Sequence, residues 1–164
     1  GLHHISSHQA DPVPAAAVSA VIDIVEDEGL VERSNIVGGL FLSMLEKVKE
    51  DYPDDIADVR GMGMMLGLEM AGEERGPRSK VLKGYIIDHL CKERGVIMSY
   101  GSWGGVFRIM PPLTITEEEL VEVVEVFRSA LRDYPSKLDN LEEFIPANPY
   151  AGPMVEKALR RLSE

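Results

Sequence analysis

The sequence predicts an α+β fold, in which a small antiparallel sheet is covered by helices and preceded by a long helix. Residues 31–51 and the segment after residue 116 carry apolar side chains at helical spacing, whereas two pairs of short runs have strand character. The order helix, helix, strand, strand, helix, strand, strand, helix differs from the strand–helix alternation of a parallel sheet. The 164 residues are enough to bury a core without a disulfide or a metal ion.

Two helices are expected at the start of the chain. The first spans residues 11–29, where Asp11 is placed to cap the helix and Gly29 is placed to end it. Its two prolines lie in the first turn, where the backbone N–H groups have no partner within the helix. The second helix spans residues 31–51 and has one apolar face. The apolar side chains of that face recur every four residues at Ile36, Leu40, Met44 and Val48.

Two strand pairs are expected in the middle of the chain. Residues 56–60 and 64–70 are joined by a segment with Gly61 and Gly63, which suits a tight hairpin and predicts an antiparallel pair. A third helix follows and ends at Arg94. Further strands are expected at residues 96–100 and 106–110.

The last long helix begins at Thr116, which caps it, and Glu119 three residues later completes a capping box. From Pro135 onward the composition shifts to Pro, Asn and Gly, with a short amphipathic segment at residues 154–162. This segment is expected to pack on the surface of the domain.

Charge and cysteine content exclude several kinds of partner. The formal charge of −11 argues against nucleic acid or an anionic membrane surface, because phosphates would be repelled. No apolar run approaches the roughly 20 residues that cross a bilayer, and no secretory signal opens the chain. The single cysteine, Cys91, excludes a disulfide framework and is typical of the reducing cytoplasm, the location expected here. Within the third helix it is interpreted as a small buried apolar residue.

Two groups of polar residues are given structural or solvent roles. The histidines His3, His4 and His8 have no Cys or second carboxylate at metal-ligand spacing beside them and are interpreted as incidental. The acidic runs are interpreted as solvated faces. They lie at residues 26–28, 54–55 and 117–119.

Arg108 is the one candidate for chemistry that the residues themselves suggest. In the predicted strand, alternation places it on one face with Val106 and Met110, while Phe107 and Ile109 occupy the other face. A guanidinium with apolar neighbours needs a partner. One interpretation is an internal ion pair with a structural carboxylate. The other is a binding site for a substrate carboxylate, which arginine grips with two parallel donors.

Four segments carry a resemblance to a known family. They are SHQADPVPAA at residues 7–16, VID at 21–23, DVRGMG at 58–63 and GVFRIMPPLT at 105–114. These segments resemble the C-terminal part of class III pyridoxal-phosphate aminotransferases, most closely 2,2-dialkylglycine decarboxylase, and the resemblance runs from about residue 6 to residue 133. It implies the C-terminal small domain of fold-type I pyridoxal-phosphate enzymes, which act as homodimers or tetramers on amino-acid and keto-acid substrates.

The resemblance also implies a division of the chain and a missing part. Residues 1–29 match the end of the large domain and an interdomain helix, residues 30–133 the small α+β domain, and residues 134–164 an extension. The family's Schiff-base lysine, and the aspartate that pairs with the pyridine nitrogen, lie upstream of anything that matches this chain. The chain alone is therefore expected to be inactive.

Site residues follow from the resemblance position by position. Arg108 matches the arginine that binds the substrate carboxylate. Ser7 matches a hydroxyl residue that reaches the cofactor phosphate of the partner subunit. In the decarboxylase an alkali-metal ion is bound nearby, at positions that match the main-chain carbonyls of Ser7 and Gln9 and the carboxylate of Asp11.

Two alternatives stay open at this point. The enzyme either decarboxylates its amino acid or only transaminates it. In place of an enzyme fragment, the chain can also be a stand-alone binding or oligomerisation module that kept the fold and lost the chemistry, a hypothesis favoured by the extension after Asp133.

Overall fold

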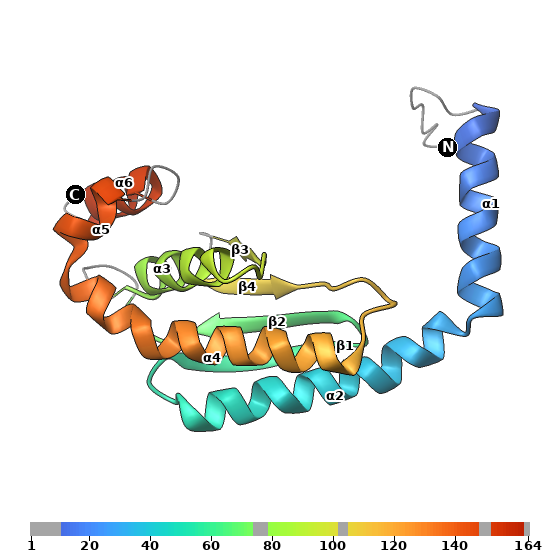
Figure 1. Ribbon diagram of the computed structural model, residues 1–164, viewed down its shortest axis with the longest axis horizontal. Coiled ribbons are helices and arrows are strands. Elements are labelled where there is room, and N and C mark those ends of the chain that lie inside the picture. Colours follow the sequence, from blue (N-terminus) through green and yellow to red (C-terminus); the bar gives the residue numbers. More distant parts are fainter. Residues whose placement is uncertain (1–10, 74–78, 102–104, 148–151, 163–164) are drawn as a thin grey trace, which may run out of the picture.

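Figure 1 shows the computed structural model of the chain, which describes residues 11–73, 79–101, 105–147 and 152–162. The helices are α1 (Pro12–Asp27), α2 (Leu30–Asp51), α3 (Lys80–Glu93), α4 (Glu117–Asp139), α5 (Leu141–Ala147) and α6 (Gly152–Leu162). The strands are β1 (Ile56–Met62), β2 (Met65–Met70), β3 (Ser99–Gly101) and β4 (Val106–Ile109). The predicted order of helices and strands up to α4 is confirmed.

The four strands form one antiparallel sheet in the order β1-β2-β4-β3. The predicted β1–β2 hairpin is confirmed. Its turn contains Gly63, whose φ of 55° lies in the left-handed region that glycine adopts without steric cost. The predicted α+β class, with a small antiparallel sheet, is therefore confirmed.

The sheet has one covered face. Helices α2 and α3 contact its strands, and α4 contacts both of these helices (Figure 1). The strand residues that point toward the helices are buried, because their side chains form one core with the apolar faces of the helices. They are Ile56, Val59, Leu66, Leu68, Met70, Phe107 and Ile109. The opposite face is left uncovered by the described helices.

The predicted helix ends are confirmed where the structure describes them. The Asp11 carboxylate accepts a hydrogen bond from the Val13 N–H at 3.0 Å, which caps α1. Gly29, with a φ of 59°, separates α1 from α2. At the start of α4, Thr116 and Glu119 form both hydrogen bonds of the capping box, at 2.8 and 3.2 Å.

Strand β3 begins later than predicted. Residues 96–100 were expected to be extended, whereas the strand covers Ser99–Gly101. The Val96 N–H donates to the carbonyl oxygen of Cys91 at 2.9 Å, so the chain is still closing the end of α3 at that point. Cys91 itself is fully buried, as predicted, and burial raises the pKa of its thiol to about 12.

The prediction that the Asp54–Asp55 run is solvated is wrong for Asp55. The Asp55 carboxylate accepts hydrogen bonds from the Lys83 ammonium, at 2.9 Å, and from the hydroxyl of Tyr134. The side chains of Lys83 and Asp55 are only 11% and 17% exposed. These residues come from α3, α4 and the turn before β1, so the cluster forms only when the three segments pack together.

The C-terminal segment contributes to the same core. Helix α4 continues through Pro135 to Asp139, beyond residue 133 where the extension was expected to start. Helices α5 and α6 follow, and α6 contacts α3. Phe144 and Val155 are buried in the core of the domain. Within the described residues, no helix combines the length and apolar content that a bilayer crossing requires.

Candidate functional site

A row of residues crosses the uncovered face of the sheet at Arg108. Gly67 of β2 is paired with Arg60 of β1 on one side and with Arg108 of β4 on the other, and Arg108 is paired with Ser99 of β3. Paired residues of antiparallel strands point to the same face. The two arginines therefore lie on one face, with Cα atoms about 10 Å apart, since each strand spacing is about 4.8 Å. Gly67 places no side chain between them.

Arg108 is exposed on this face. Its Nη2 donates a hydrogen bond to the hydroxyl of Ser99 at 3.3 Å. Among the residues that the structure describes, no carboxylate lies within ion-pair distance of it. The internal ion pair, one of the two interpretations of Arg108, is therefore not found in this part of the chain.

The alternation predicted for this strand is confirmed, since Phe107 and Ile109 are buried while Arg108 is exposed. The neighbours of Arg108 on its own face are apolar, as predicted, but they are not buried. Met110 is 58% exposed and Val106 is half-buried, because these residues lie on the uncovered face of the sheet. Because these neighbours leave the guanidinium exposed to water, it is not desolvated and does not need an internal partner.

A cavity of about 790 Å³ lies at this end of the sheet, and Arg108 and Ser99 line it. The rest of its wall is mostly apolar and comes from residues 95–98, residues 109–112 and the start of α4. Two carboxylates, Glu119 and Glu122, also line the cavity, and that of Glu119 accepts the N-cap hydrogen bond of α4. A cavity with an apolar wall and few polar groups is the usual form of a small-molecule site.

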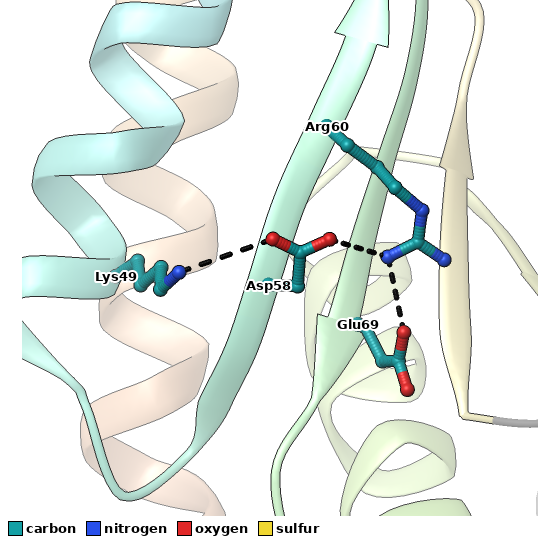
Figure 2. A network of polar contacts seen from close by, with 4 residues as sticks. All are labelled: Lys49, Asp58, Arg60 and Glu69. Carbon is teal, nitrogen blue, oxygen red and sulfur yellow. Dashed lines mark hydrogen bonds and ion pairs between the residues drawn. The ribbon is translucent and has the colours of Figure 1, made fainter.

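Arg60, the second arginine of the face, is held by carboxylates (Figure 2). Its Nη1 donates to Asp58 at 2.7 Å and to Glu69 at 3.0 Å. Lys49 of α2 lies 3.9 Å from the other oxygen of Asp58. The hydrogen bond from Arg60 holds the pKa of Asp58 below its usual value, and the two carboxylates raise the pKa of Arg60.

The two arginines therefore differ in what they offer a ligand. The cluster of Lys49, Asp58, Arg60 and Glu69 contains two cations and two anions and is balanced within itself. Arg108 has a hydroxyl as its described partner and keeps its charge available. On this face, Arg108 is the arginine suited to bind an external carboxylate.

Comparison with known proteins identifies the family. The sequence profile described as "Aminotransferase class-III" matches residues 2–131. The chain belongs to the class III aminotransferases. This family is pyridoxal-phosphate-dependent.

Individual relatives agree with this assignment. An uncharacterized aminotransferase of Schizosaccharomyces pombe is 40% identical over 134 residues, which are 80% of this chain and 30% of that protein. An alanine/serine racemase of Pyrococcus horikoshii is 35% identical over 124 residues, 76% of this chain and 26% of its own. The crystal structure of acetylornithine aminotransferase from Elizabethkingia anophelis aligns with a TM-score of 0.68 at 31% identity, covering 81% of this chain and 31% of that structure. The chain thus spans about 30% of the length of the relatives that it matches.

The cavity at Arg108 offers no attachment point for the cofactor among its described lining residues. None of the residues that line the cavity at Arg108 is a lysine, so the described part of the chain offers no amine there to bind the cofactor aldehyde. The described lining of this cavity offers a guanidinium that can bind a carboxylate and no amine that can bind the cofactor aldehyde.

Of the predicted cofactor and metal residues, the structure describes Asp11 alone. Ser7 and Gln9, like the histidines near the N-terminus, lie outside the described residues. Asp11 caps the end of α1 that is remote from α2, about 24 Å along a helix of 16 residues. Within the described part of the chain, no group of three or more His, Cys, Asp or Glu side chains is arranged to hold a metal ion.

The cluster around Arg60 was not predicted from the sequence. Its signal was present, since alternation in β1 places Asp58 and Arg60 on one face and Glu69 follows in the next predicted strand. Which of these residues face one another depends on the hairpin register, and the bulge between Ile56 and Asp58 shifts that register.

Proposed function

We propose that this chain is the C-terminal part of a pyridoxal-phosphate-dependent class III aminotransferase and supplies the arginine that binds the substrate carboxylate. One observation carries the proposal: Arg108 lines a cavity at the end of the sheet with a hydroxyl, and no carboxylate, as its described partner. The family assignment supports the same role, because Arg108 stands in the motif that resembles the family's carboxylate-binding segment.

The geometry suits the capture of a carboxylate. The arginine rises from the central strand β4, which is paired on both sides, so its backbone is fixed before the ligand arrives. A planar guanidinium donates two parallel N–H groups to the two oxygens of a carboxylate, and this bidentate contact sets the orientation of the ligand. Ser99 contacts one end of the guanidinium and limits its rotation. Arg108 thus binds and orients an amino acid or a keto acid.

The remaining parts of the site belong to the longer protein. Bound pyridoxal phosphate supplies an electron sink for the substrate α-carbon. Its lysine and the aspartate beside its ring are expected in the sequence upstream of this chain, in line with the relatives being about three times as long. We infer that the chain alone is inactive and that the enzyme is a homodimer or tetramer, in which Ser7 contacts the cofactor phosphate of the partner subunit.

The finer assignments also belong to this proposal. The segment around Arg108 resembles that of 2,2-dialkylglycine decarboxylase, which favours substrates with an α-carboxylate and either decarboxylation or transamination. Ser7, Gln9 and Asp11 would bind an alkali-metal ion through hard oxygen ligands, and Asp11 can do so while it caps α1. The single cysteine supports a cytoplasmic location.

The test is substitution of Arg108 in the full-length enzyme. Arg108→Ala is expected to lower kcat/KM for the amino acid about a hundredfold, since a misplaced substrate alone can cost that much. Arg108→Lys should lose less, and the absorbance of the bound cofactor should stay unchanged in both. Arg128→Ala is the control, because Arg128 pairs with Asp51 away from the cavity. Unchanged kinetics in Arg108→Ala would remove this residue from the site.

A second candidate, a non-catalytic binding or oligomerisation module, is favoured by the extension. Helices α5 and α6 lie beyond the residues that match the family profile, yet Phe144 and Val155 are part of the core. The two candidates differ in their reading frames. A reading frame that encodes an upstream lysine segment supports the enzyme hypothesis. So does a full-length product that releases carbon dioxide from 2-aminoisobutyrate or transaminates it. A natural start near Gly1 supports the module.

A further inference from the structure

Arg33 of α2 reaches across to the segment that follows β4. Its Nε donates to the carbonyl oxygen of Leu113 at 3.0 Å, and its Nη2 donates to the carbonyl oxygen of Ile115. The side chain is partly buried, and both of these acceptors are backbone groups some 80 residues away in the sequence. A single side chain therefore spans two carbonyls of the β4–α4 connection.

Leu113 and Ile115 of this connection pack against the core, but the described residues give its backbone few other polar contacts with the rest of the domain. It follows directly after β4, whose pairing ends at Ile109. Pro111 and Pro112 have no N–H groups, so they cannot continue the strand ladder. Within the connection, the Ile115 N–H donates to the Pro112 carbonyl at 3.1 Å, which makes a local turn but anchors nothing to the rest of the domain. The two hydrogen bonds from Arg33 supply that anchor.

The same part of α2 holds the neighbouring turn. The hydroxyl of Ser34 accepts a hydrogen bond from the Met64 N–H at 3.2 Å. One helical turn later, Gly38 contacts the β1–β2 turn so closely that a Cβ there would lie 2.1 Å from the carbonyl oxygen of Gly63. Leu66, just after this turn, pairs with Ile109 at the end of β4. The first turns of α2 thus hold both connections at the sheet end next to Arg108.

We propose that Arg33 is a positioning residue for Arg108, which fixes the β4–α4 connection and so keeps the guanidinium in the orientation that binds a carboxylate. This inference rests on the proposed function. Arg33 is absent from the lining of the cavity, whereas Pro111, Pro112 and Thr114 of the connection line it together with Arg108. Arg33 acts through the backbone, because its donors are engaged by the carbonyls of Leu113 and Ile115.

The first experiment uses the 164-residue chain and measures hydrogen exchange at the Ile115 amide. Arg33→Gln is expected to speed this exchange about tenfold, the usual consequence of losing the stronger hydrogen bonds that a charged donor makes. The matched control is Arg128→Gln. Arg128 also joins α2 to α4, through Asp51, but at the opposite end of α2. Equal exchange in the two variants would overturn the anchoring role.

The second experiment uses the full-length enzyme and compares a carboxylate with its neutral analogue. Inhibition constants are measured for propionate and propionamide. Arg33→Gln should raise the constant for propionate about tenfold and leave that for propionamide unchanged, since only the acid needs an oriented guanidinium. Arg33→Lys, which retains the charge but cannot span two carbonyls with a planar fork, should lie between wild type and Arg33→Gln. Arg128→Gln should change neither constant.

The outcomes separate this inference from the proposed function. A rise for both inhibitors in Arg33→Gln would show a merely structural role and overturn the proposal, as would no rise for either. If Arg108→Ala weakens the binding of propionate and neither Arg33 variant does, the positioning role of Arg33 is refuted and the proposed function is supported. If Arg108→Ala has no effect, both fall. Should Arg33→Gln fail to fold, Arg33→Lys decides by the same comparison.

Discussion

The two faces of the sheet are made from the same strands but differ in what their side chains do. On the covered face, Phe107 is fully buried and contacts the ring of Phe127 in a T-shaped arrangement, with the two ring centroids 5.4 Å apart. On the uncovered face, the next residue, Arg108, is exposed and lines a cavity. One peptide bond thus separates a residue that stabilises the domain from one that we assign to substrate binding.

This comparison shows why the strand is a suitable support for the site. The residues before and after Arg108 are buried, and their packing holds the strand backbone in place. The exposed arginine side chain can therefore be presented to a ligand without lowering the free energy of unfolding. The cluster around Arg60 adds a second lesson. Charges on the uncovered face are either balanced by neighbours or left available, and the pairing register decides which.

The sharpest test of the difference compares two adjacent alanine substitutions. Phe107→Ala should lower the free energy of unfolding by about 4 kcal/mol, because it leaves a cavity in the core. Arg108→Ala should change it by less than about 0.5 kcal/mol, since an exposed side chain away from structural contacts is lost. Urea denaturation of the chain, followed by circular dichroism, measures both. A loss above about 2 kcal/mol in Arg108→Ala would contradict the division of roles.

A second pair of variants tests the close contact on the covered side. Gly38→Ala should destabilise the chain by about 2 kcal/mol or more, because its Cβ would lie 2.1 Å from the Gly63 carbonyl oxygen. Gly39→Ala should stabilise it by about 0.8 kcal/mol, since alanine is the better helix former and its Cβ meets no atom within 4 Å. Thermal denaturation gives the sign of each. The same sign for both would show that the contact does not constrain α2.

The smallest expected effect concerns the uncovered face and pH. The folded-state pKa of Asp58 is lowered by Arg60, so its contribution to stability is complete above its unfolded-state pKa, about 3.9, and is lost as the pH falls through the lower folded-state value. Asp58→Asn should be less stable than wild type at pH 7, and the difference should vanish in strong acid. Urea midpoints at a series of pH values measure this. A stability difference between the two proteins that does not change with pH would show that the Arg60 contact is not its cause.

Much of the fold is encoded locally and was predictable. Asp11, Gly29, Thr116 and Glu119 mark the ends of helices through contacts within a few residues, and the structure confirms each of them. The position of Cys91 in a buried helix face followed from the same kind of pattern. These contacts depend on sequence separations of at most four or so, where neighbours in the chain are neighbours in space.

The errors at Asp55 and Arg108 share one cause. Asp55 was expected in solvent because its own segment is acidic, yet its partners Lys83 and Tyr134 are 28 and 79 residues away. Arg108 was expected to need a partner because its neighbours on the same face are apolar, yet that face of the sheet is uncovered and these neighbours are not buried. A local pattern shows which residues share a face, but it does not show what packs against that face.

The sequence by itself determined the α+β class, the helix ends, the alternation that sets Arg108 apart from Phe107, and the family motifs, because these depend on spacing along the chain. Only the tertiary structure decided that Arg60 is balanced by Asp58 and Glu69, that Arg108 is not, and that Arg33 holds the connection beside it. These facts depend on strand register and helix packing, which bring together residues separated by up to 82 positions. The sequence gives the charge of each side chain, while the tertiary structure determines which residue it contacts.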